Sequence, residues 1–565
     1  MVVTCCNSCI SADRHFCPLY AVRCVATYLF LHLLLAPIAD ISLIMNTKLA
    51  VPIAAQNLDQ AKQQIKAAKA AGADILELRT DYLENLNVGL VRQLIDEVKT
   101  SSDRVLPIIV TCRDKQQGGA IDYPLKLRVD VLTAALKAGA EFVDFEYENF
   151  FSIENSEKIK VAMARALKGR LIMSVHNFET KFTDIKKVYR HIQTLYSAAI
   201  PKVVYTANHI NDCFDAFDLL HNTSGERIVF CMASAGMASR ILAKKLGCFV
   251  TFASLDAETA TASGQLTIEQ FKKLYRYDSI NSDTEFYAIL GSPIAHSLSP
   301  ALHNACFNDI AANKVYLPLL VDGGSDEFNR FMNNIVNRRW LGFRGFSVTI
   351  PHKANALRYV KEKQGFVEPL AERIGAANTL IIGTNGRLSA YNTDYAGALD
   401  AIASAMDNAR DSLDGLPVAV IGAGGVARAI VAGLSDAGAK IKIYNRTVKK
   451  GENLAAEFGC DFAPLDDLTG IEAKLLVNCT SIGMHPDINA SPVPRECLKE
   501  DMIVFDTVYN PAETLLLKQA TDAGAKTIDG VTMFVNQALA QFKLFTGRDA
   551  DPRLMRKTIS DCFSY

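Results

Sequence analysis

The chain has 565 residues, of which 49% are hydrophobic and 21% are charged. This length and composition predict several soluble domains, each of which buries its own core. The formal net charge is −1 and no basic stripe alternates with aromatic residues, which argues against a protein that binds nucleic acid.

The 14 cysteines are unevenly distributed. Five lie within the first 24 residues, and the other nine are scattered singly without a CxxC pair. This pattern favours a reducing compartment, where most cysteines are small buried apolar residues. We therefore expect neither a disulfide framework nor a metal site.

Residues 1–45 differ from the rest of the chain. Their apolar run CVATYLFLHLLLAPIADISLI is interrupted by a histidine, a proline and an aspartate. It is too short and too broken for a membrane span, so we expect no stable membrane insertion. Two interpretations stay open: an N-terminal extension that is disordered or directs targeting, or a start of translation at Met45.

Residues 46–275 contain short apolar stretches that alternate with helical periodicity, and Gly72 and Gly139 are expected to end two of the helices. The expected strands are AVPIAA from Ala50, ILELRTD from Ile75, VLPIIVTCR from Val105, FVDFEYE from Phe142, RLIMSVHNF from Arg170, IPKVVYTA from Ile200, RIVFCMA from Arg227 and FVTFASL from Phe249. Eight such units in about 230 residues predict a (β/α)8 TIM barrel with its active site at the carboxyl ends of the strands.

Polar residues lie at or near the ends of these strands, among them His176 and several arginines. Lys202 lies within the apolar strand IPKVVYTA, where a charged ammonium is unfavourable. Burial there would lower the pKa of Lys202 and leave a free amine that can form an imine. By position alone, His176 fits a core histidine as well as a catalytic one. Together these residues indicate Schiff-base chemistry on an anionic carbonyl substrate.

The barrel resembles type I 3-dehydroquinate dehydratases through the ordered motifs ELRTD, TCRDKQQGG, SVHNF, IPKVVYTA, SRILAKKLG and the GQ of ATASGQL. The resemblance implies that Lys202 forms the imine and that His176 acts as general acid and base. It also implies that Arg240 binds the substrate carboxylate. The other substrate-binding residues that it implies are Glu77, Arg79, Arg113, Thr261 and Gln265.

The barrel departs from that family at two places. Gln117 stands where a glutamate usually precedes the two glycines, and TASGQ, from Thr261, stands where Ser-Ala-Pro-Gly-Gln is usual. An amide carries no charge, so we expect the carboxylate's help in positioning or charging His176 to be lost. Loss of the proline is expected to loosen the loop over the site. Both departures predict a working but slow dehydratase.

A linker is expected over the polar residues 276–284, followed by a second α/β region over 285–395 with strands FYAILG, VYLPLLV and FSVTIP. A nucleotide-binding unit is expected over 396–529. A last helix over 530–560 is expected to pack back on the region 285–395 and complete it. The predicted fold class is thus α/β, with an N-terminal TIM barrel and a two-domain dehydrogenase that contains a Rossmann domain.

A glycine-rich turn follows the strand at Val418 and forms the expected dinucleotide site. Such a turn also serves ordinary tight turns, but here a helix follows and the next strand, KIKIYNRT, ends at the expected spacing of ~20 residues or a little more. Its backbone N–H groups would approach a pyrophosphate at a helix N-terminus. The turn consists of Gly422, Ala423, Gly424, Gly425 and Val426.

The end of KIKIYNRT distinguishes NADP from NAD. A fold selective for NAD places an acidic residue there, but this chain has Asn445, Arg446 and Thr447, followed by Lys449 and Lys450. A guanidinium pairs with a 2′-phosphate, which a carboxylate would repel. We therefore expect NADP(H), with Lys450 in the site and at least one of the two lysines merely solvated.

From about Glu285 to Phe545 the chain resembles shikimate dehydrogenases through GSPIAHSLSP, SVTIPHK, AANT, NTD, VNCTSIGM, DTVYNP and GVTMFVNQALAQFKLFTG. The resemblance implies a catalytic pair, Lys353 and Asp394, in which the ammonium stabilises charge on the ketone oxygen and delivers a proton. It adds Thr480 and Gly530 to the cofactor site. The implied shikimate-binding residues are Ser297, Ser299, Thr349, Asn378, Tyr509 and Gln537.

Joined in this order, the two halves resemble the bifunctional dehydratase-dehydrogenases of plants, in which the first product is the second substrate. We expect small-molecule partners (3-dehydroquinate, 3-dehydroshikimate and shikimate), a monomer, and a plastid location by resemblance, or a cytosolic one if translation starts at Met45. The alternative is a quinate/shikimate dehydrogenase with a weakened or non-catalytic barrel. Ser299 and Thr349 leave less room beside the substrate ring and favour shikimate.

Overall fold

The computed structural model describes residues 47–565, apart from 101–103, 166–168, 263, 295–296, 407–412, 469–470 and 564–565. The described residues belong to one compact unit, Thr47–Tyr565. The expected N-terminal extension and the alternative start at Met45 lie outside them.

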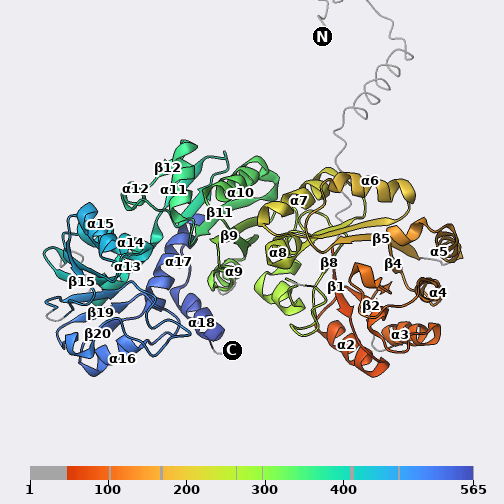
Figure 1. Ribbon diagram of the computed structural model, residues 1–565, viewed down its shortest axis with the longest axis horizontal. Helices are drawn as coiled ribbons and strands as arrows, with labels where there is room; N and C mark the ends of the chain where they lie inside the picture. Colours follow the sequence, from red (N-terminus) through yellow and green to blue (C-terminus); the bar gives the residue numbers. More distant parts are fainter. Residues whose placement is uncertain are drawn as a thin grey trace, which may run out of the picture. The chain divides into compact units, whose positions relative to one another are not determined.

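The first part of this unit is the expected barrel, drawn from red to yellow in Figure 1. All eight expected strands form and pair in parallel in the order β7-β6-β5-β4-β3-β2-β1-β8, so the sheet curls into a nearly closed barrel. The strands are β1 (Lys48–Ile53), β2 (Ile75–Arg79), β3 (Ile108–Thr111), β4 (Phe142–Glu146), β5 (Arg170–Asn177), β6 (Ile200–Thr206), β7 (Ile228–Met232) and β8 (Val250–Phe252).

Helices cover the outside of the barrel (Figure 1). Gly72 and Gly139 lie just beyond α2 and α4 with φ of 86° and 87°, a left-handed conformation that glycine adopts without strain, so both expected helix ends are confirmed. The helices are α2 (Leu58–Ala70), α3 (Val88–Thr100), α4 (Leu125–Lys137), α5 (Ile153–Arg165), α6 (Ile185–Leu195), α7 (Cys213–Asn222) and α8 (Ala233–Ile241).

The residues expected as a polar linker are packed against the barrel. Tyr277, Ile280 and Thr284 are buried, and Tyr277 contacts Phe271 edge to face at 5.1 Å. The Nζ atom of Lys244 donates to the backbone oxygens of Tyr277 and Asp278 at 3.1 and 2.7 Å. The aromatic and aliphatic residues among the polar ones therefore attach this stretch to the protein.

The second part begins with a mixed six-stranded sheet in the order β10-β9-β11-β13-β14-β12. Its strands are β9 (Glu285–Gly291), β10 (Lys314–Leu320), β11 (Phe343–Val348), β12 (Phe366–Val367), β13 (Thr379–Ile382) and β14 (Leu388–Tyr391). Its helices are α9 (Ser299–Asp309), α10 (Ser325–Asn337), α11 (Lys353–Glu362), α12 (Pro369–Ile374) and α13 (Thr393–Ala405). β13 runs antiparallel to both of its neighbours, so this sheet is not doubly wound.

A parallel six-stranded sheet follows in the order β17-β16-β15-β18-β19-β20. This is the strand order of a Rossmann domain, whose switch point lies between the first and fourth strands, here β15 and β18. The strands are β15 (Pro417–Ile421), β16 (Lys440–Asn445), β17 (Asp461–Pro464), β18 (Leu475–Asn478), β19 (Ile503–Asp506) and β20 (Lys526–Ile528). The helices are α14 (Gly425–Asp436), α15 (Val448–Phe458) and α16 (Leu515–Asp522).

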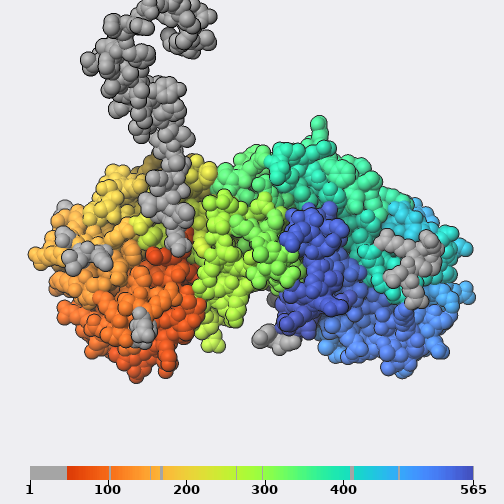
Figure 2. Space-filling view, turned by 180° about the vertical axis from the view of Figure 1, so that it is seen from behind, coloured from red at the N-terminus to blue at the C-terminus, as the bar shows by residue number. Residues whose placement is uncertain are grey.

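The C-terminal segment differs from the single helix expected over 530–560. It forms α17 (Gly530–Thr546) and α18 (Pro552–Phe563), because Gly547 ends α17 in a left-handed conformation with φ of 70°. As expected, α17 packs against β11 and β13, and α18 packs against α9. Figure 2 shows the dark blue surface of this segment adjoining the green surface of the region that begins at β9. Residues from the two ends of the dehydrogenase half therefore share one core.

We expect Phe542→Ala to destabilise the dehydrogenase half by about 3–5 kcal/mol, because it removes a buried aromatic side chain. Phe542 is fully buried and its ring centroid lies 5.5 Å from that of Phe307. Calorimetric unfolding of the full chain measures the loss as a lower midpoint for one transition. Phe366→Ala is the matched control because Phe366 is 42% exposed, and equal shifts for the two variants would refute this packing.

Candidate active sites

A cavity of about 520 Å³ opens at the carboxyl ends of the barrel strands. The structure brings together there every residue that the sequence placed in the dehydratase site. They come from β2, β5, β6, α8 and the segments after β3 and β8. The residues are Glu77, Arg79, Arg113, His176, Lys202, Arg240, Thr261 and Gln265.

Lys202 is buried, as its apolar chain neighbours predicted, with 4% of its surface exposed. Its Nζ atom donates to Asp144 Oδ2 at 2.7 Å and lies 3.9 Å from Glu77 Oε1. The ammonium also lies 4.6 Å from the centre of the Phe252 ring. Alternate residues of β6 point inward, where carboxylates of other strands lie beside the lysine, and these partners were not predicted from the sequence.

Asp144, which the sequence analysis missed, joins several of the site's polar groups. It accepts from Ser174 Oγ at 2.6 Å and pairs with Arg113 at 2.9 Å as well as with Lys202. Burial alone would raise its pKa, but Arg113 and Lys202 lower it far below the ordinary range. The two cations therefore favour the anionic form of Asp144. The alternation of acidic and apolar residues in FVDFE was the pattern that could have revealed it.

His176 is positioned by the side chain of Gln117. Gln117 Oε1 accepts from the His176 backbone N–H at 3.1 Å and lies 3.3 Å from the ring Nδ1 atom. Burial, Arg113 and Lys202 lower the pKa of His176 well below its ordinary value, which favours the neutral ring. The prediction that Gln117 leaves His176 without positioning is wrong, because an amide oxygen accepts a hydrogen bond as a carboxylate does.

Arg240 differs from the other arginines of the cavity. Arg79 pairs with Asp81 at 2.8 Å and Arg113 pairs with Asp144, whereas no ion pair with Arg240 is found in the part of the chain that the structure describes. It is 1% exposed, its Nε atom lacks a partner, and burial lowers its pKa to about 10. An uncompensated buried guanidinium strongly favours an anion beside it.

Thr261, Ala262 and Gln265, which follow β8, line this cavity, and a local contact joins two of them. Gln265 Oε1 accepts from the backbone N–H of Thr261 at 2.9 Å and lies 3.2 Å from its hydroxyl. The predicted loosening of this loop remains untested, because Ser263 lies outside the described residues.

A second cleft, of about 1380 Å³, lies between the two sheets of the dehydrogenase half. It is lined by every residue that the sequence placed in the shikimate site, together with Val426 and Gly530 of the expected cofactor site. The eight residues are Ser297, Ser299, Thr349, Lys353, Asn378, Asp394, Tyr509 and Gln537.

Lys353 and Asp394 form a direct pair, with Nζ donating to Oδ2 at 2.6 Å. Lys353 begins α11, and Asp394 lies in the first turn of α13, where the helix dipole stabilises a carboxylate. Asn378 Nδ2 donates to the other Asp394 oxygen at 2.8 Å. The carboxylate is thus fixed from three sides, and the ammonium faces the cleft.

Gln541 and Ser347 also line this cleft and were missed by the sequence analysis. Ser347 Oγ donates to Gln541 Oε1 at 2.7 Å, and Gln541 Nε2 donates to Thr379 Oγ1 at 3.1 Å. Gln541 lies four residues after Gln537 on α17, which places both on one face of the helix. That spacing could have identified Gln541.

The glycine turn after β15 has the geometry of a cradle for a pyrophosphate. A Cβ atom on Gly424 or Gly425 would meet nothing within 4 Å, so there is open space at the N-terminus of α14. Gly422 has a φ of 108°, and a Cβ there would lie 3.0 Å from Thr480 Cγ2. The residues present therefore fit a dinucleotide.

Arg446 and Thr447 are exposed just beyond β16, next to this turn. The backbone oxygen of Tyr444 accepts from Gly422 N at 2.7 Å, which fixes the end of β16 beside the cradle. Asn445 Nδ2 donates to Thr447 O at 2.8 Å and shapes the loop. The Arg446 guanidinium is available to an anion at this edge.

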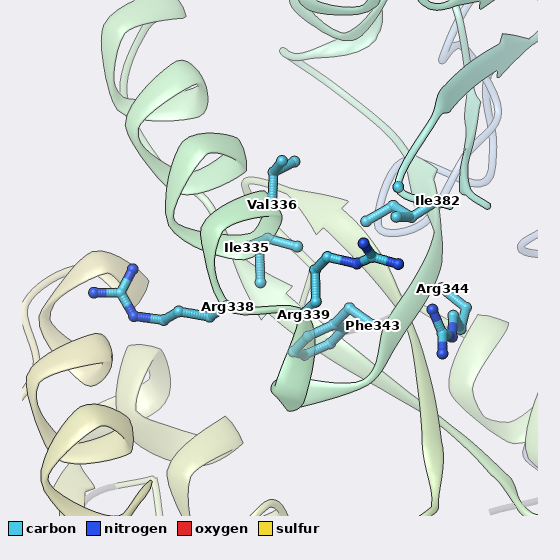
Figure 3. A pocket seen from close by; sticks show the side chains of 8 residues that line it. Ile335, Val336, Arg338, Arg339, Phe343, Arg344 and Ile382 are labelled. Carbon is cyan, nitrogen blue, oxygen red and sulfur yellow. The ribbon is translucent and has the colours of Figure 1, made fainter. Parts of the chain in front are cut away.

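A smaller cavity contains three arginines, yet it is not an anion site (Figure 3). In Figure 3 the side chain of Arg338 points away from that of Arg344. Arg338 pairs with Asp218 at 2.7 Å, Arg344 pairs with Glu285 at 2.9 Å, and Arg339 donates to Thr384 O. Each of the three guanidinium groups thus already has a hydrogen-bond or ion-pair partner within the protein.

Two further classes of site are absent from the described residues. No group of three or more acidic, histidine or cysteine side chains there is arranged to hold a metal ion. No helix among them is long and apolar enough to cross a membrane.

Family models cover most of the chain. The type I 3-dehydroquinase model matches residues 49–282, and the shikimate dehydrogenase substrate-binding domain matches 289–380. The shikimate/quinate 5-dehydrogenase model matches 404–513, and the shikimate 5′-dehydrogenase C-terminal domain matches 530–559.

Individual relatives agree with these matches. The chain is 34% identical over 529 residues, 91% of its length, to the chloroplastic bifunctional 3-dehydroquinate dehydratase/shikimate dehydrogenase of Arabidopsis thaliana, of which it covers 84%. It is 38% identical to the NADP(+) shikimate dehydrogenase of Methanosarcina barkeri, over 49% of this chain and 97% of that protein.

Among solved structures, the shikimate 5-dehydrogenase of Thermus thermophilus with NADP(H) and shikimate is 34% identical, with a TM-score of 0.43 over 49% of this chain and 99% of that one. The Arabidopsis relative is matched through both halves in a single alignment. The chain therefore belongs to the family of bifunctional enzymes that join a type I 3-dehydroquinase to a shikimate dehydrogenase.

Proposed function

We propose that the chain dehydrates 3-dehydroquinate to 3-dehydroshikimate in the barrel and reduces that product to shikimate with NADPH in the second cleft. The observation that carries this proposal is that each cavity gathers a complete set of reacting groups. The 34% identity to the Arabidopsis enzyme through both halves supports it.

In the barrel, Arg240 binds the substrate carboxylate and Lys202 faces the ketone. The Lys202 Nζ atom attacks the carbonyl carbon, and the two protons that its ammonium gives up leave with the carbonyl oxygen as water, which forms an iminium. His176 removes a proton from the neighbouring carbon, and the electron pair moves toward the nitrogen. The β-hydroxyl then takes the proton from His176 and leaves as water, and hydrolysis of the imine restores Lys202.

In the second cleft, Lys353 lies at the reacting oxygen. The glycine turn and Arg446 would hold NADPH, which would supply a hydride for the ketone carbon. Negative charge then grows on the ketone oxygen, which the Lys353 ammonium stabilises and protonates. Asp394 keeps the ammonium in place through the 2.6 Å contact.

Shikimate, rather than quinate, is the proposed product. Ser299 and Thr349, which line the cleft, restrict the space beside the substrate ring. A barrel that only binds ligands is disfavoured, because Lys202 and His176 keep their partners Asp144 and Gln117. Parallel turnover of shikimate and quinate with both cofactors discriminates the two substrates.

We also propose that the protein acts in plastids as a monomer. The name of the Arabidopsis relative, which includes "chloroplastic", supports the location. Fractionation of cells that express the tagged full-length chain tests the compartment, and light scattering of the purified chain tests its mass.

The purified chain is expected to convert 3-dehydroquinate and NADPH to shikimate. Lys202→Ala should abolish this coupled reaction but still reduce added 3-dehydroshikimate. Lys353→Ala should accumulate 3-dehydroshikimate, with NADP binding nearly unchanged, since the lysine lies at the ketone. Product chromatography measures all three reactions, and a Lys353→Ala protein that still makes shikimate at the normal rate would overturn the assignment.

Borohydride with 3-dehydroquinate is expected to label the peptide that contains Lys202. Asp144→Asn should slow trapping about tenfold or more, because it removes one partner of a buried ion pair. Mass spectrometry of the labelled peptide measures the rate. Lys272→Ala is the control, since Lys272 pairs with exposed Asp278, and a label at Lys272 instead of Lys202 would disprove the imine assignment.

Arg446→Ala is expected to raise the KM for NADPH about 10-fold or more, the effect of losing a charge-assisted hydrogen bond. The KM for NADH should hardly change, since NADH lacks the 2′-phosphate. Lys442→Ala, on the preceding strand β16 with its ammonium over the Tyr444 ring, is the matched control. Equal losses with NADPH and NADH would contradict a 2′-phosphate site at Arg446.

A further inference from the structure

The amide of Gln117 has only one orientation that satisfies its surroundings. Its Oε1 atom accepts from the His176 backbone N–H, which is always a donor. Its Nε2 atom donates to Glu148 Oε2 at 2.9 Å. If the amide were turned over, its N–H donors would face the backbone N–H donor of His176, and its oxygen would face the acceptor oxygen of Glu148. Neither hydrogen bond could then form.

This orientation determines which nitrogen of His176 carries the proton. The ring Nδ1 atom lies 3.3 Å from the same Gln117 oxygen, which can only accept. Nδ1 therefore carries the hydrogen, and Nε2 is left unprotonated. Since His176 lines the barrel cavity, a free Nε2 is the form needed for a base.

We propose that Glu148 is a positioning residue of the dehydratase, which acts through Gln117 to fix the His176 tautomer. This inference rests on the proposed dehydratase function. Glu148 begins the short helix Glu148–Phe151 after β4, whereas Gln117 ends the short helix Lys115–Gln117 after β3. Two neighbouring loops of the barrel thus supply two groups: the carboxylate of Glu148 contacts the amide of Gln117, and that amide contacts His176. The family usually has a single carboxylate at the position of Gln117.

Exposure explains why Gln117 needs this second contact. Gln117 is half-buried and Glu148 is exposed, so water competes for the amide. Without Glu148, the side chain keeps only its contacts to His176 among the described residues, and the 3.3 Å ring contact is the longer of these. The tautomer would then be less strictly fixed, while the fold of the barrel would not depend on this surface residue.

Glu148→Ala is expected to lower kcat of the dehydratase about 5-fold with little change in KM, the size of one lost hydrogen bond. Glu148→Gln should restore most of the rate, because its amide oxygen still accepts from Gln117. Glu154→Ala, which removes a 79% exposed partner of Lys158, is the matched control and should leave kcat unchanged. Reduction of 3-dehydroshikimate by the same samples should not change and shows that each chain is folded.

Exchanging the side chains of Gln117 and Glu148 gives a sharper test. Gln117→Glu alone would place two carboxylates at the 2.9 Å contact, which repel, so the rate should fall. The double variant Gln117→Glu with Glu148→Gln should recover it, since one amide and one carboxylate are again in contact. Additive losses in the double variant would refute coupling between the two positions.

Nitrogen-15 spectra of the histidine rings report the tautomer without any turnover. The chain has 10 histidines, so the His176 signals are assigned by their absence from His176→Asn. In the ligand-free protein, Nε2 of His176 is expected at the shift of an unprotonated nitrogen, and Glu148→Ala should introduce the other tautomer. An unchanged spectrum and kcat in Glu148→Ala would overturn the inference. A changed spectrum in a chain without dehydratase activity would instead refute the proposed function alone.

Discussion

The barrel site depends on the requirement that buried charges be compensated. Asp144 meets this requirement for two cations, Lys202 and Arg113, at distances of 2.7 and 2.9 Å. Removing water from an unpaired ammonium is strongly unfavourable, so without this carboxylate Lys202 would have to be neutral or displaced. Arg240 is the exception, because no carboxylate among the described residues pairs with it. Its positive charge therefore gives the cavity a preference for an anionic ligand. One cavity therefore holds a fixed amine and an open anion site.

The dehydrogenase cleft also contains a lysine paired with an aspartate, but this pair is less buried than Lys202 and Asp144. Its Lys353–Asp394 pair is fixed by helix starts and by Asn378 rather than by a network of charges. Asn378 accepts from Thr379, which in turn accepts from Gln541 of α17. The last helices of the chain thus complete a site whose other residues come from its middle. This explains why α17 must return to β11 and β13 after the Rossmann sheet.

Features coded locally could be predicted from the sequence. Apolar alternation predicted all eight barrel strands, and the barrel rule placed Glu77, Arg113 and His176 at one end of it. The break at Gly547 was missed, since a glycine there was not weighed as a helix end. Tyr509 and Gln537 were found by family resemblance only, because nothing in their local pattern marks them as ligands.

Contacts between strands could not be predicted in the same way. The apolar chain neighbours of Lys202 did not indicate its partner Asp144, which lies 58 residues earlier. Gln117 was expected to leave His176 unpositioned, but the orientation of its amide depends on Glu148, 31 residues later. A one-dimensional pattern shows which residues are polar, whereas the distance between two strands or loops decides which polar groups pair.

In the proposed mechanism, the amide at Gln117 would also affect how His176 shares its two proton transfers. A carboxylate beside Nδ1 would stabilise the imidazolium and raise the pKa of the ring, whereas an amide leaves the pKa low, as burial, Arg113 and Lys202 make it. A ring of lower pKa is a weaker base but, once protonated, a stronger acid. Removal of the substrate proton therefore becomes the harder step, and return of that proton to the leaving hydroxyl becomes the easier one. The tautomer fixed by Gln117 and Glu148 matters most in the harder step, since an unprotonated Nε2 must already face the substrate.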